Sequence, residues 1–211
     1  MKNTEKKQSN RKKPARGPDD EAGKSTDNRE KILATALTLF TERGFFGTPT
    51  SLISKEAGVA TGTLFFYFPT KEELIDTLYR RIKSEAATVL RRNFDNEKTA
   101  LAKLRRVGFN AVEWGIENPA KQKFMEQFAH SPFVSTNAHE EGMSHFRFLK
   151  ELVGDGICKG TIRNIDSDLL FCMMASSFSG LIARAYAEKD PDPRKKITEE
   201  GLDFIFNGMK A

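Results

Sequence analysis

Apolar residues along this chain recur every three or four positions, which is the spacing of amphipathic helices. In the first such segment, residues 27–44, Leu33, Ala36, Leu37 and Phe40 fall on one helical face. No later segment alternates apolar and polar residues as a half-buried strand does, so the expected fold class is all-α. Further helices are predicted over residues 50–58, 61–68, 70–90, 98–117, 120–131, 137–158, 166–188 and 197–209.

Local motifs mark where these helices begin and end. Asp27-Asn-Arg-Glu30 and Thr70-Lys-Glu-Glu73 each place a capping side chain three residues before a glutamate, which is the arrangement of a capping box. Glycine and proline mark the helix ends. Breaks are expected at Gly44, Gly58, Pro69, Asn118-Pro119, Pro132, Gly160 and Asp190-Pro-Asp-Pro193.

The N-terminal segment differs in composition from the rest. Between Lys2 and Lys31 there is no Val, Ile, Leu, Met or aromatic residue, so this stretch cannot build a core by itself. Residues 1–71 hold 13 Lys and Arg against 8 Asp and Glu, a difference that equals the formal net charge of +5 of the whole chain. Residues 1–26 are therefore expected to form a flexible basic arm, and the localised charge favours a polyanionic partner. A tail that only keeps the chain soluble would have the same composition.

The overall composition is typical of a soluble globular protein. The 211 residues are 38% apolar and 30% charged, and the mean hydropathy is −0.51. The N-terminus lacks the apolar core of a secretory signal, and the longest apolar stretch, Leu169 to Ala183, is too short to cross a bilayer. We therefore expect a cytoplasmic protein with no membrane partner.

Residues 50–68 are predicted to form two short helices joined by a tight turn. Ala57 is small where the helices would approach, and Gly58 suits the turn. Thr61 and Thr63 lie near the start of the second helix, where a helix-turn-helix presents side chains to base edges in the major groove. The pattern predicts DNA binding, although the aromatic residues could simply form the core of a small three-helix unit. Three residues of the second helix are expected to face the core: Leu64, Phe65 and Phe68.

These motifs resemble those of the TetR family of transcriptional regulators. The resemblance implies a helix-turn-helix DNA-binding domain over residues 27–72 and a helical ligand-binding and dimerisation domain over residues 73–211. It is carried by Ile32-Leu-Ala-Thr-Ala-Leu-Thr-Leu-Phe40, Gly44-Phe45, Thr48-Pro-Thr50, Ile53-Ser-Lys-Glu-Ala-Gly-Val59, Gly62-Thr-Leu-Phe-Phe-Tyr-Phe68 and Lys71-Glu-Glu-Leu74.

The resemblance also implies which residues meet DNA. Thr50 matches the hydroxyl that contacts phosphate at the start of the family's second helix, and Lys71 matches its phosphate-binding lysine. Phe66 departs from the family, which has Tyr or Trp at this position, so Tyr67 is expected to supply the hydroxyl instead. The full expected set is Thr50, Ser51, Thr61, Gly62, Thr63, Tyr67 and Lys71.

Two C-terminal helices are candidates for a homodimer interface. The segment from Leu169 to Ala183 is apolar on nearly every side, and residues 202–209 present one apolar face. The resemblance implies that these helices pair with their symmetry mates, and a two-fold dimer would suit a palindromic double-stranded operator. Packing inside the chain's own core is the alternative. The expected interface residues are Phe171, Ala175, Phe178, Ser179, Ile182, Leu202, Ile205 and Phe206.

Aromatic residues between these helices and the DNA-binding domain are candidates for an effector pocket. Such a lining suits a small hydrophobic or planar compound, with Trp114 and His130 as polar contacts. Ordinary core packing would also account for them. The candidate set is Phe109, Trp114, Phe124, Phe128, His130 and Phe146.

Motifs for catalysis are missing from the sequence. It contains no GxSxG, HExxH, GxxxxGK[ST] or GxGxxG, and its three histidines are not spaced as metal ligands. We therefore expect no enzymatic activity, no metal and no cofactor. The predicted function is a bacterial repressor that a small-molecule effector releases from its operator on the nucleoid. The alternative is a helical ligand- or protein-binding module that has lost sequence-specific DNA binding.

Overall fold

The protein is all-helical over residues 18–211, which are the residues that the computed structural model describes. No β-strand forms within this range, so the predicted fold class is confirmed. The elements are α1 (Pro18–Arg43), α2 (Thr50–Glu56), α3 (Thr61–Tyr67), α4 (Lys71–Leu90), the 3-10 helix η1 (Phe94–Asn96), α5 (Ala100–Glu117), α6 (Pro119–Phe128), α7 (Thr136–Ser144), α8 (Arg147–Cys158), α9 (Ser167–Ala187) and α10 (Pro191–Asn207).

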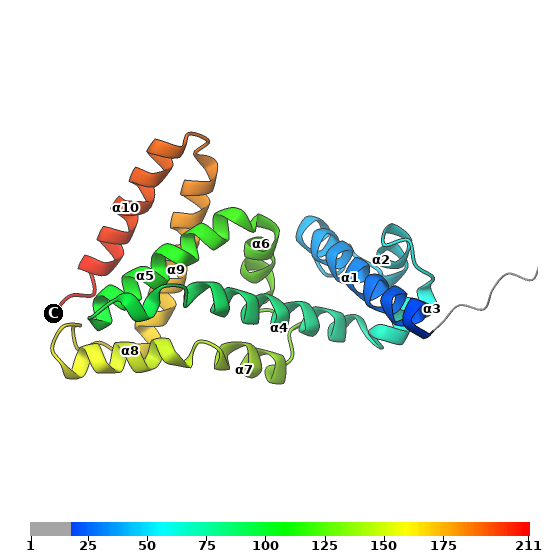
Figure 1. Ribbon diagram of the computed structural model, residues 1–211, viewed down its shortest axis with the longest axis horizontal. Coiled ribbons are helices and arrows are strands. Elements are labelled where there is room, and N and C mark those ends of the chain that lie inside the picture. The colour runs from blue at the N-terminus through cyan, green and yellow to red at the C-terminus, as the bar shows by residue number, and fades with distance from the viewer. Residues whose placement is uncertain (1–17) are drawn as a thin grey trace, which may run out of the picture.

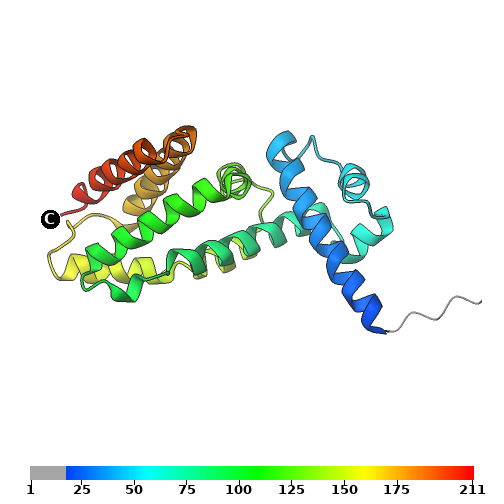
Figure 2. The same ribbon diagram turned by 45° about the horizontal axis from the view of Figure 1, so that its top comes forward.

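The helices form a small head and a larger body, which α4 joins. In Figure 1, α1, α2 and α3 gather at one end, and α4 runs from them through the middle of the molecule. The body contains α5 to α10, with α7 and α8 following each other along α4. Figure 2 shows α9 and α10 as a pair of neighbouring helices beside α5.

One hydrophobic core runs from the head into the body. Phe40 of α1 and Phe68, just after α3, are buried in the same cluster as Leu74 of α4 and Phe124 of α6. The boundary predicted between residues 72 and 73 therefore falls inside a continuous core. Head and body share buried side chains, and their packing energies are coupled.

A second core holds the far end of the body together. Here α5 approaches α9 closely because two of its positions are glycine. A Cβ atom on Gly108 would lie 2.9 Å from the rings of Phe178 and Phe206, and one on Gly115 would lie 2.8 Å from Ile182. A larger residue at either position would force the two helices apart.

The predicted start of the first helix is wrong. The helix begins at Pro18, where a missing backbone N–H suits the first turn, so Asp27 lies inside α1 and caps nothing. Asp27 instead accepts a hydrogen bond from Lys31, one turn further on, and Glu30 pairs with Arg81 of α4. Part of the predicted flexible arm is thus helical, while its first 17 residues lie outside the described range.

The other differences from the predicted helices arise at single residues. The segment predicted as one helix over residues 137–158 is broken at Phe146, whose backbone (φ −103°, ψ 8°) is not helical. The last helix begins at Pro191, six residues earlier than predicted, with proline again in the first turn. One of the two hydrogen bonds of the capping box predicted at Thr70 is confirmed: the Thr70 hydroxyl accepts a hydrogen bond from the backbone N–H of Glu73 at 3.0 Å.

Candidate nucleic-acid interface and effector cavity

The helix-turn-helix is built around one glycine. Gly58 has a φ of +66°, the left-handed conformation that allows α2 to turn sharply into α3. The turn is closed by backbone bonds from Gly58 N–H to the Lys55 carbonyl (3.1 Å) and from Val59 N–H to the Ser54 carbonyl (3.0 Å). Ala57 is buried beside it. The local signals in the sequence therefore predict this motif correctly.

The start of α3 presents small polar groups on the surface. Thr61 and Gly62 are exposed and Thr63 is half-buried. The hydroxyls of Thr61 and Ser54 lie 3.1 Å apart in a hydrogen bond that fixes the Thr61 side chain. No Cβ-sized obstacle lies near Gly62, so the backbone of α3 can approach another surface closely.

Helix α2 contributes hydroxyls to the same part of the head. Thr50 is the first residue of α2, and its side chain makes no capping bond because Pro49 occupies the N-cap position. Ser51 beside it is exposed. A structural role for Thr50 as a helix cap is therefore not supported.

The aromatic run on α3 divides between core and surface. Leu64 and Phe68 are buried, as predicted, but Phe65 is 43% exposed. The prediction for Phe65 is wrong because Leu64 and Phe68, one turn apart, already fill the inward face. Phe66 is 79% exposed, and its ring meets Tyr67 edge-on at 5.1 Å.

Lys71 lies where the head joins α4. Its ammonium donates a hydrogen bond to the backbone carbonyl of Phe45 and sits 3.9 Å from the centroid of the Phe45 ring. Partial burial lowers the pKa of Lys71 from its ordinary value, and neighbouring Glu72 opposes that shift. In this conformation Lys71, which is predicted to bind a DNA phosphate, is held against the loop between α1 and α2.

Three phenylalanines link that loop to the body, and we call them the phenylalanine joint: Phe45, Phe46 and Phe133. Phe45 stacks on Phe133, from the loop between α6 and α7, at 3.9 Å and an interplanar angle of 4°. Phe46 meets both rings edge-on. Aromatic contacts of this kind contribute about 0.5–1.5 kcal/mol per pair. The joint connects the loop before the helix-turn-helix to the end of α6.

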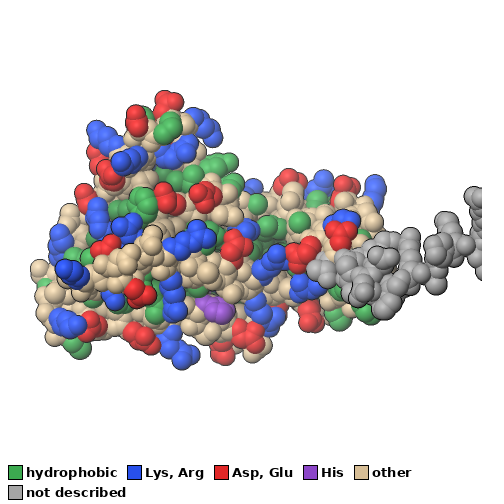
Figure 3. All heavy atoms as spheres, in the orientation of Figure 1, with side chains coloured by type: hydrophobic (Ala, Val, Ile, Leu, Met, Phe, Trp, Pro, Cys, Tyr) green, Lys and Arg blue, Asp and Glu red, His purple; other side chains and the backbone are tan. Residues whose placement is uncertain are grey.

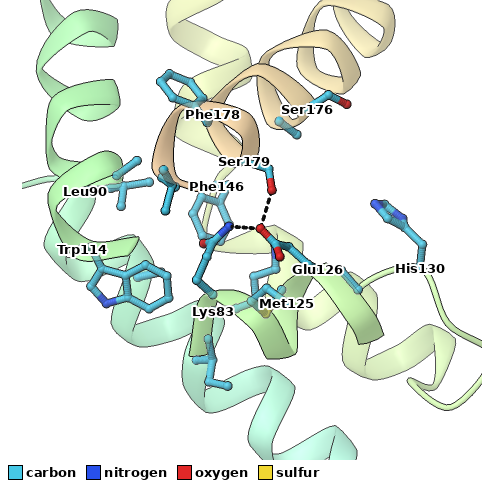
Figure 4. A pocket seen from close by; sticks show the side chains of 17 residues that line it. Lys83, Leu90, Trp114, Met125, Glu126, His130, Phe146, Ser176, Phe178 and Ser179 are labelled. Atoms are coloured by element: carbon cyan, nitrogen blue, oxygen red, sulfur yellow. Dashed lines mark hydrogen bonds between the residues drawn. The ribbon is translucent and has the colours of Figure 1, made fainter. Parts of the chain in front are cut away.

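The body contains a cavity of about 640 Å³ between α4, α5, α6 and α9. Its volume lies within the range of small-molecule sites. Figure 4 shows Trp114 and His130 on opposite sides of Glu126, with Phe178 and Ser179 reaching in from α9. The lining residues are Ile82, Lys83, Ala86, Leu90, Ala111, Trp114, Gln122, Met125, Glu126, Ala129, His130, Phe146, Ala175, Ser176, Phe178, Ser179 and Ile182.

Only half of the expected pocket residues line this cavity, namely Trp114, His130 and Phe146. Phe124 and Phe128 stack on each other at 4.8 Å in the core that joins head and body. Phe109 packs against the second core. The rings of these three residues pack in the protein interior and do not line the cavity.

Polar groups on the cavity wall come from three helices. The carboxylate of Glu126 accepts hydrogen bonds from Gln122 at 3.0 Å and from Ser179 of α9 at 2.5 Å (Figure 4). Lys83 of α4 was missed by the sequence analysis. Burial lowers the pKa of Lys83 to about 8. Its ammonium lies 5.0 Å from the centroid of the Phe146 ring.

The expected dimer residues fall into two groups. Ile182, Leu202 and Phe206 are buried in the chain's own core and cannot meet a partner without repacking. Phe171, Phe178, Ser179 and Ile205 are partly buried, and Ala175 is exposed on α9. The protomer core thus accounts for much of the apolar character of these helices.

A different face of α9 and α10 is apolar and exposed. Leu169 and Met173 are exposed on α9, and Phe204 of α10 is 82% exposed. Figure 3 shows hydrophobic side chains gathered beside the α9–α10 pair, and side chains of both charges scattered over the rest of the visible surface. By length and hydropathy α9 alone among the described helices could also cross a membrane. A helix that is buried on one side and paired on the other has the same composition.

Over residues 18–211 no group of three His, Cys, Asp or Glu side chains is placed to hold a metal ion. Cys158 and Cys172 are both free and exposed.

Comparison with known proteins agrees with this geometry. The family model "Bacterial regulatory proteins, tetR family" matches residues 32–78, which span the helix-turn-helix. A TetR-family transcription regulator from Shewanella sp. PV-4 has a similar structure, with a TM-score of 0.80, 28% identity and coverage of 87% of this chain and 98% of the other.

Two transcriptional regulators match this chain over nearly their whole length. The transcriptional regulator YhgD of Bacillus subtilis is 27% identical over 89% of this chain and 99% of its own. The transcriptional repressor KstR2 of Mycobacterium tuberculosis is 24% identical over 89% of this chain and 96% of its own. These relatives are regulators rather than enzymes. They support the predicted DNA-binding regulator over the alternative, a helical module that has lost sequence-specific DNA binding.

Proposed function

Because this chain belongs to the TetR family of bacterial transcriptional regulators, we propose that it is a dimeric repressor that leaves a palindromic operator when a small molecule fills the cavity of its body. The observation that carries the proposal is the surface formed by the start of α3 beside the first turn of α2. It presents hydroxyls and bare backbone, with Phe65 and Phe66 exposed at its edge. The protein would act in the bacterial cytoplasm, on the nucleoid.

The DNA contacts that we propose divide by role. Thr61, Gly62 and Thr63 would meet base edges, where hydroxyls and threonine methyls touch several bases without strict selection. The phosphate backbone would be held by Thr50, Ser51, Tyr67 and Lys71. For Lys71 this requires its ammonium to leave the Phe45 carbonyl, a rearrangement that a phosphate would favour because it offers a full negative charge.

The second copy of the chain would cover the exposed face of α9. Its outward stripe, which runs along the whole helix, consists of Leu169, Met173, Ser176, Gly180, Ala183 and Ala187. Apolar and small side chains at this spacing permit close helix pairing, and Phe204 of α10 extends the surface. Two-fold pairing would set the separation of the two α3 helices.

The route from cavity to DNA would run through α6. Met125 and Glu126 of α6 and Ala129 just after it line the cavity, and the chain then reaches Phe133 in the phenylalanine joint. A ligand that displaces α6 would therefore move the head relative to α4. Ligand and operator must weaken each other's binding by the same factor if this mechanism holds.

The direct test is selection of bound duplexes from a random DNA pool at about physiological salt, that is, about 0.15 M. The native protein should enrich a palindrome. Lys71→Ala should weaken binding to every selected sequence, whereas Lys150→Ala, which removes an exposed cation from α8, should not. Failure of the native protein to enrich any sequence contradicts the proposal.

The dimer is tested separately by sedimentation. Met173→Glu places a charge in the proposed interface and should yield monomers. Met143→Glu makes the same change on α7, where the side chain is also exposed, and should leave the dimer intact. A monomeric native protein, or equal behaviour of both variants, refutes the α9 interface.

A further inference from the structure

Lys83 is an unusual residue for the wall of an apolar cavity. It projects from α4 between the aromatic rings of Phe146 (5.0 Å) and Tyr79 (5.6 Å). Among the side chains described, residues 27–211, it has no ion pair and no hydrogen bond, and no carboxylate contributes to the shift of its pKa. Lys83 is half-buried, and contact with aromatic faces replaces only part of the hydration that its ammonium loses.

The acidic group of the same cavity, Glu126, makes no ion pair with Lys83. One carboxylate oxygen of Glu126 accepts hydrogen bonds from Gln122, one turn earlier on α6, and from Ser179 of α9. Lys83 is the only Lys or Arg among the described lining residues. The cavity therefore combines a large apolar wall with one cation and one carboxylate that do not pair with each other.

We propose that the effector is an amphipathic anion, with a carboxylate that pairs with Lys83 and an apolar body that fills the space between Trp114, Met125 and Phe178. This inference rests on the proposed function, since it names the class of molecule that the cavity takes. A carboxylate on the effector would supply the counter-ion that the half-buried ammonium of Lys83 lacks. A charge-assisted hydrogen bond is also among the stronger polar contacts in proteins.

The apolar body follows from the remaining wall. Eight aliphatic or methionine side chains line the cavity beside the aromatic ones: Ile82, Ala86, Leu90, Ala111, Met125, Ala129, Ala175 and Ile182. They come from α4, α5, α6 and α9, so one ligand would touch every helix that borders the site. A small polar anion would leave this surface in contact with water and gain little from its burial.

The chain carries its own reporter of occupancy. Trp114 is the only tryptophan, it lines the cavity, and its indole N–H donates to Glu85 at 3.3 Å. Its fluorescence can be followed while sodium dodecanoate, methyl dodecanoate or dodecyltrimethylammonium is added below its micelle concentration. These probes share a twelve-carbon chain and differ in the charge of the head.

Dodecanoate should bind more tightly than the neutral ester and the cation. Lys83→Met keeps the length of the side chain and removes its charge, and it should weaken dodecanoate binding by about tenfold or more while leaving the ester unchanged. Lys103→Met is the matched control, because Lys103 also lies over a ring, that of Phe94 at 4.7 Å, but outside the cavity. It should bind all three probes as the native protein does. Lys83→Arg, which keeps the charge, should retain the preference for dodecanoate.

The inference is overturned if dodecanoate does not bind, if the cation binds better, or if Lys83→Met binds dodecanoate with native affinity. If Lys83→Met does not fold, judged by circular dichroism, loss of the anion preference in Lys83→Gln decides in its favour and retention decides against it. Operator binding without any probe is measured on the same samples. A protein that binds its operator but not dodecanoate refutes the anionic effector and leaves the regulator standing.

Discussion

Truncation of Phe128 should destabilise head and body together. The side chain is 3% exposed, lies 4.8 Å from the ring of Phe124 and 5.8 Å from that of Phe40, and so connects α6 with α1. Phe128→Ala removes a buried ring from a core that has no other group to replace it. Such changes cost about 3–5 kcal/mol, a large share of the roughly 5–15 kcal/mol that stabilises a typical domain.

The expected shift in melting temperature follows from this loss. For a chain of this size each kcal/mol lowers Tm by about 2–4 °C, so Phe128→Ala should lower it by roughly 6–20 °C. Phe66→Ala also removes a phenyl ring, but from the surface, and should change stability by no more than about 0.5 kcal/mol. Melting is followed at one protein concentration, because dimerisation makes Tm depend on concentration.

Two probes make the test specific for the shared core. Circular dichroism reports all helices, whereas Trp114 reports the body, and both should show one coincident transition that Phe128→Ala moves as a whole. A loss below about 1 kcal/mol would contradict the packing described for Phe128. Separate transitions, with only the head affected, would show that head and body do not share a cooperative core.

The remaining predictions concern single contacts. Gly58→Ala should lower stability by about 1–2 kcal/mol in thermal melts because a Cβ is strained at φ +66°. Gly62→Ala should not lower it, since a Cβ at position 62 would meet open space. The same melting temperature for both variants would exclude backbone strain as the cause. Lys71→Met should lower the slope of log affinity for the operator against log salt by about one, and an unchanged slope would mean that this ammonium touches no phosphate. Asp76→Ala leaves the backbone N–H and hydroxyl of Ser135 without their acceptor, and urea unfolding should show that the free energy of unfolding falls by about 1–3 kcal/mol. An unchanged free energy of unfolding would show that these contacts are dispensable.

Local signals allow the DNA-binding head to be predicted from sequence. A glycine at the turn, a threonine cap before α4 and the spacing of apolar residues each act within a few residues of where they occur. The same reasoning misplaces the start of α1, because Asp27 is a good cap in isolation but a helix that has already begun continues through it. Phe65 was misplaced for a related reason: a run of aromatic residues on a short helix does not state which of them turn inward.

The body is harder to predict because its helices are apolar on several faces. Which face of α9 meets the core depends on Gly108 and Gly115 of α5, about 70 residues earlier in the chain. Periodicity therefore could not separate buried Ile182 from exposed Met173. Lys83 did carry a signal: it lies four residues after Tyr79 and seven before Leu90, on a helix face that is otherwise buried and apolar.

The core shared by head and body also determines how such a protein can be recombined. A chimaera that joins this head to another regulator's body between residues 72 and 73 would separate Phe40 from Phe128 and Phe45 from Phe133. The transplanted head would carry an uncovered apolar surface and a loop without its stacking partner. The smallest unit that can be exchanged therefore includes α6 with the head, and new specificities in this scaffold are more safely obtained by changing side chains on α3 than by exchanging domains.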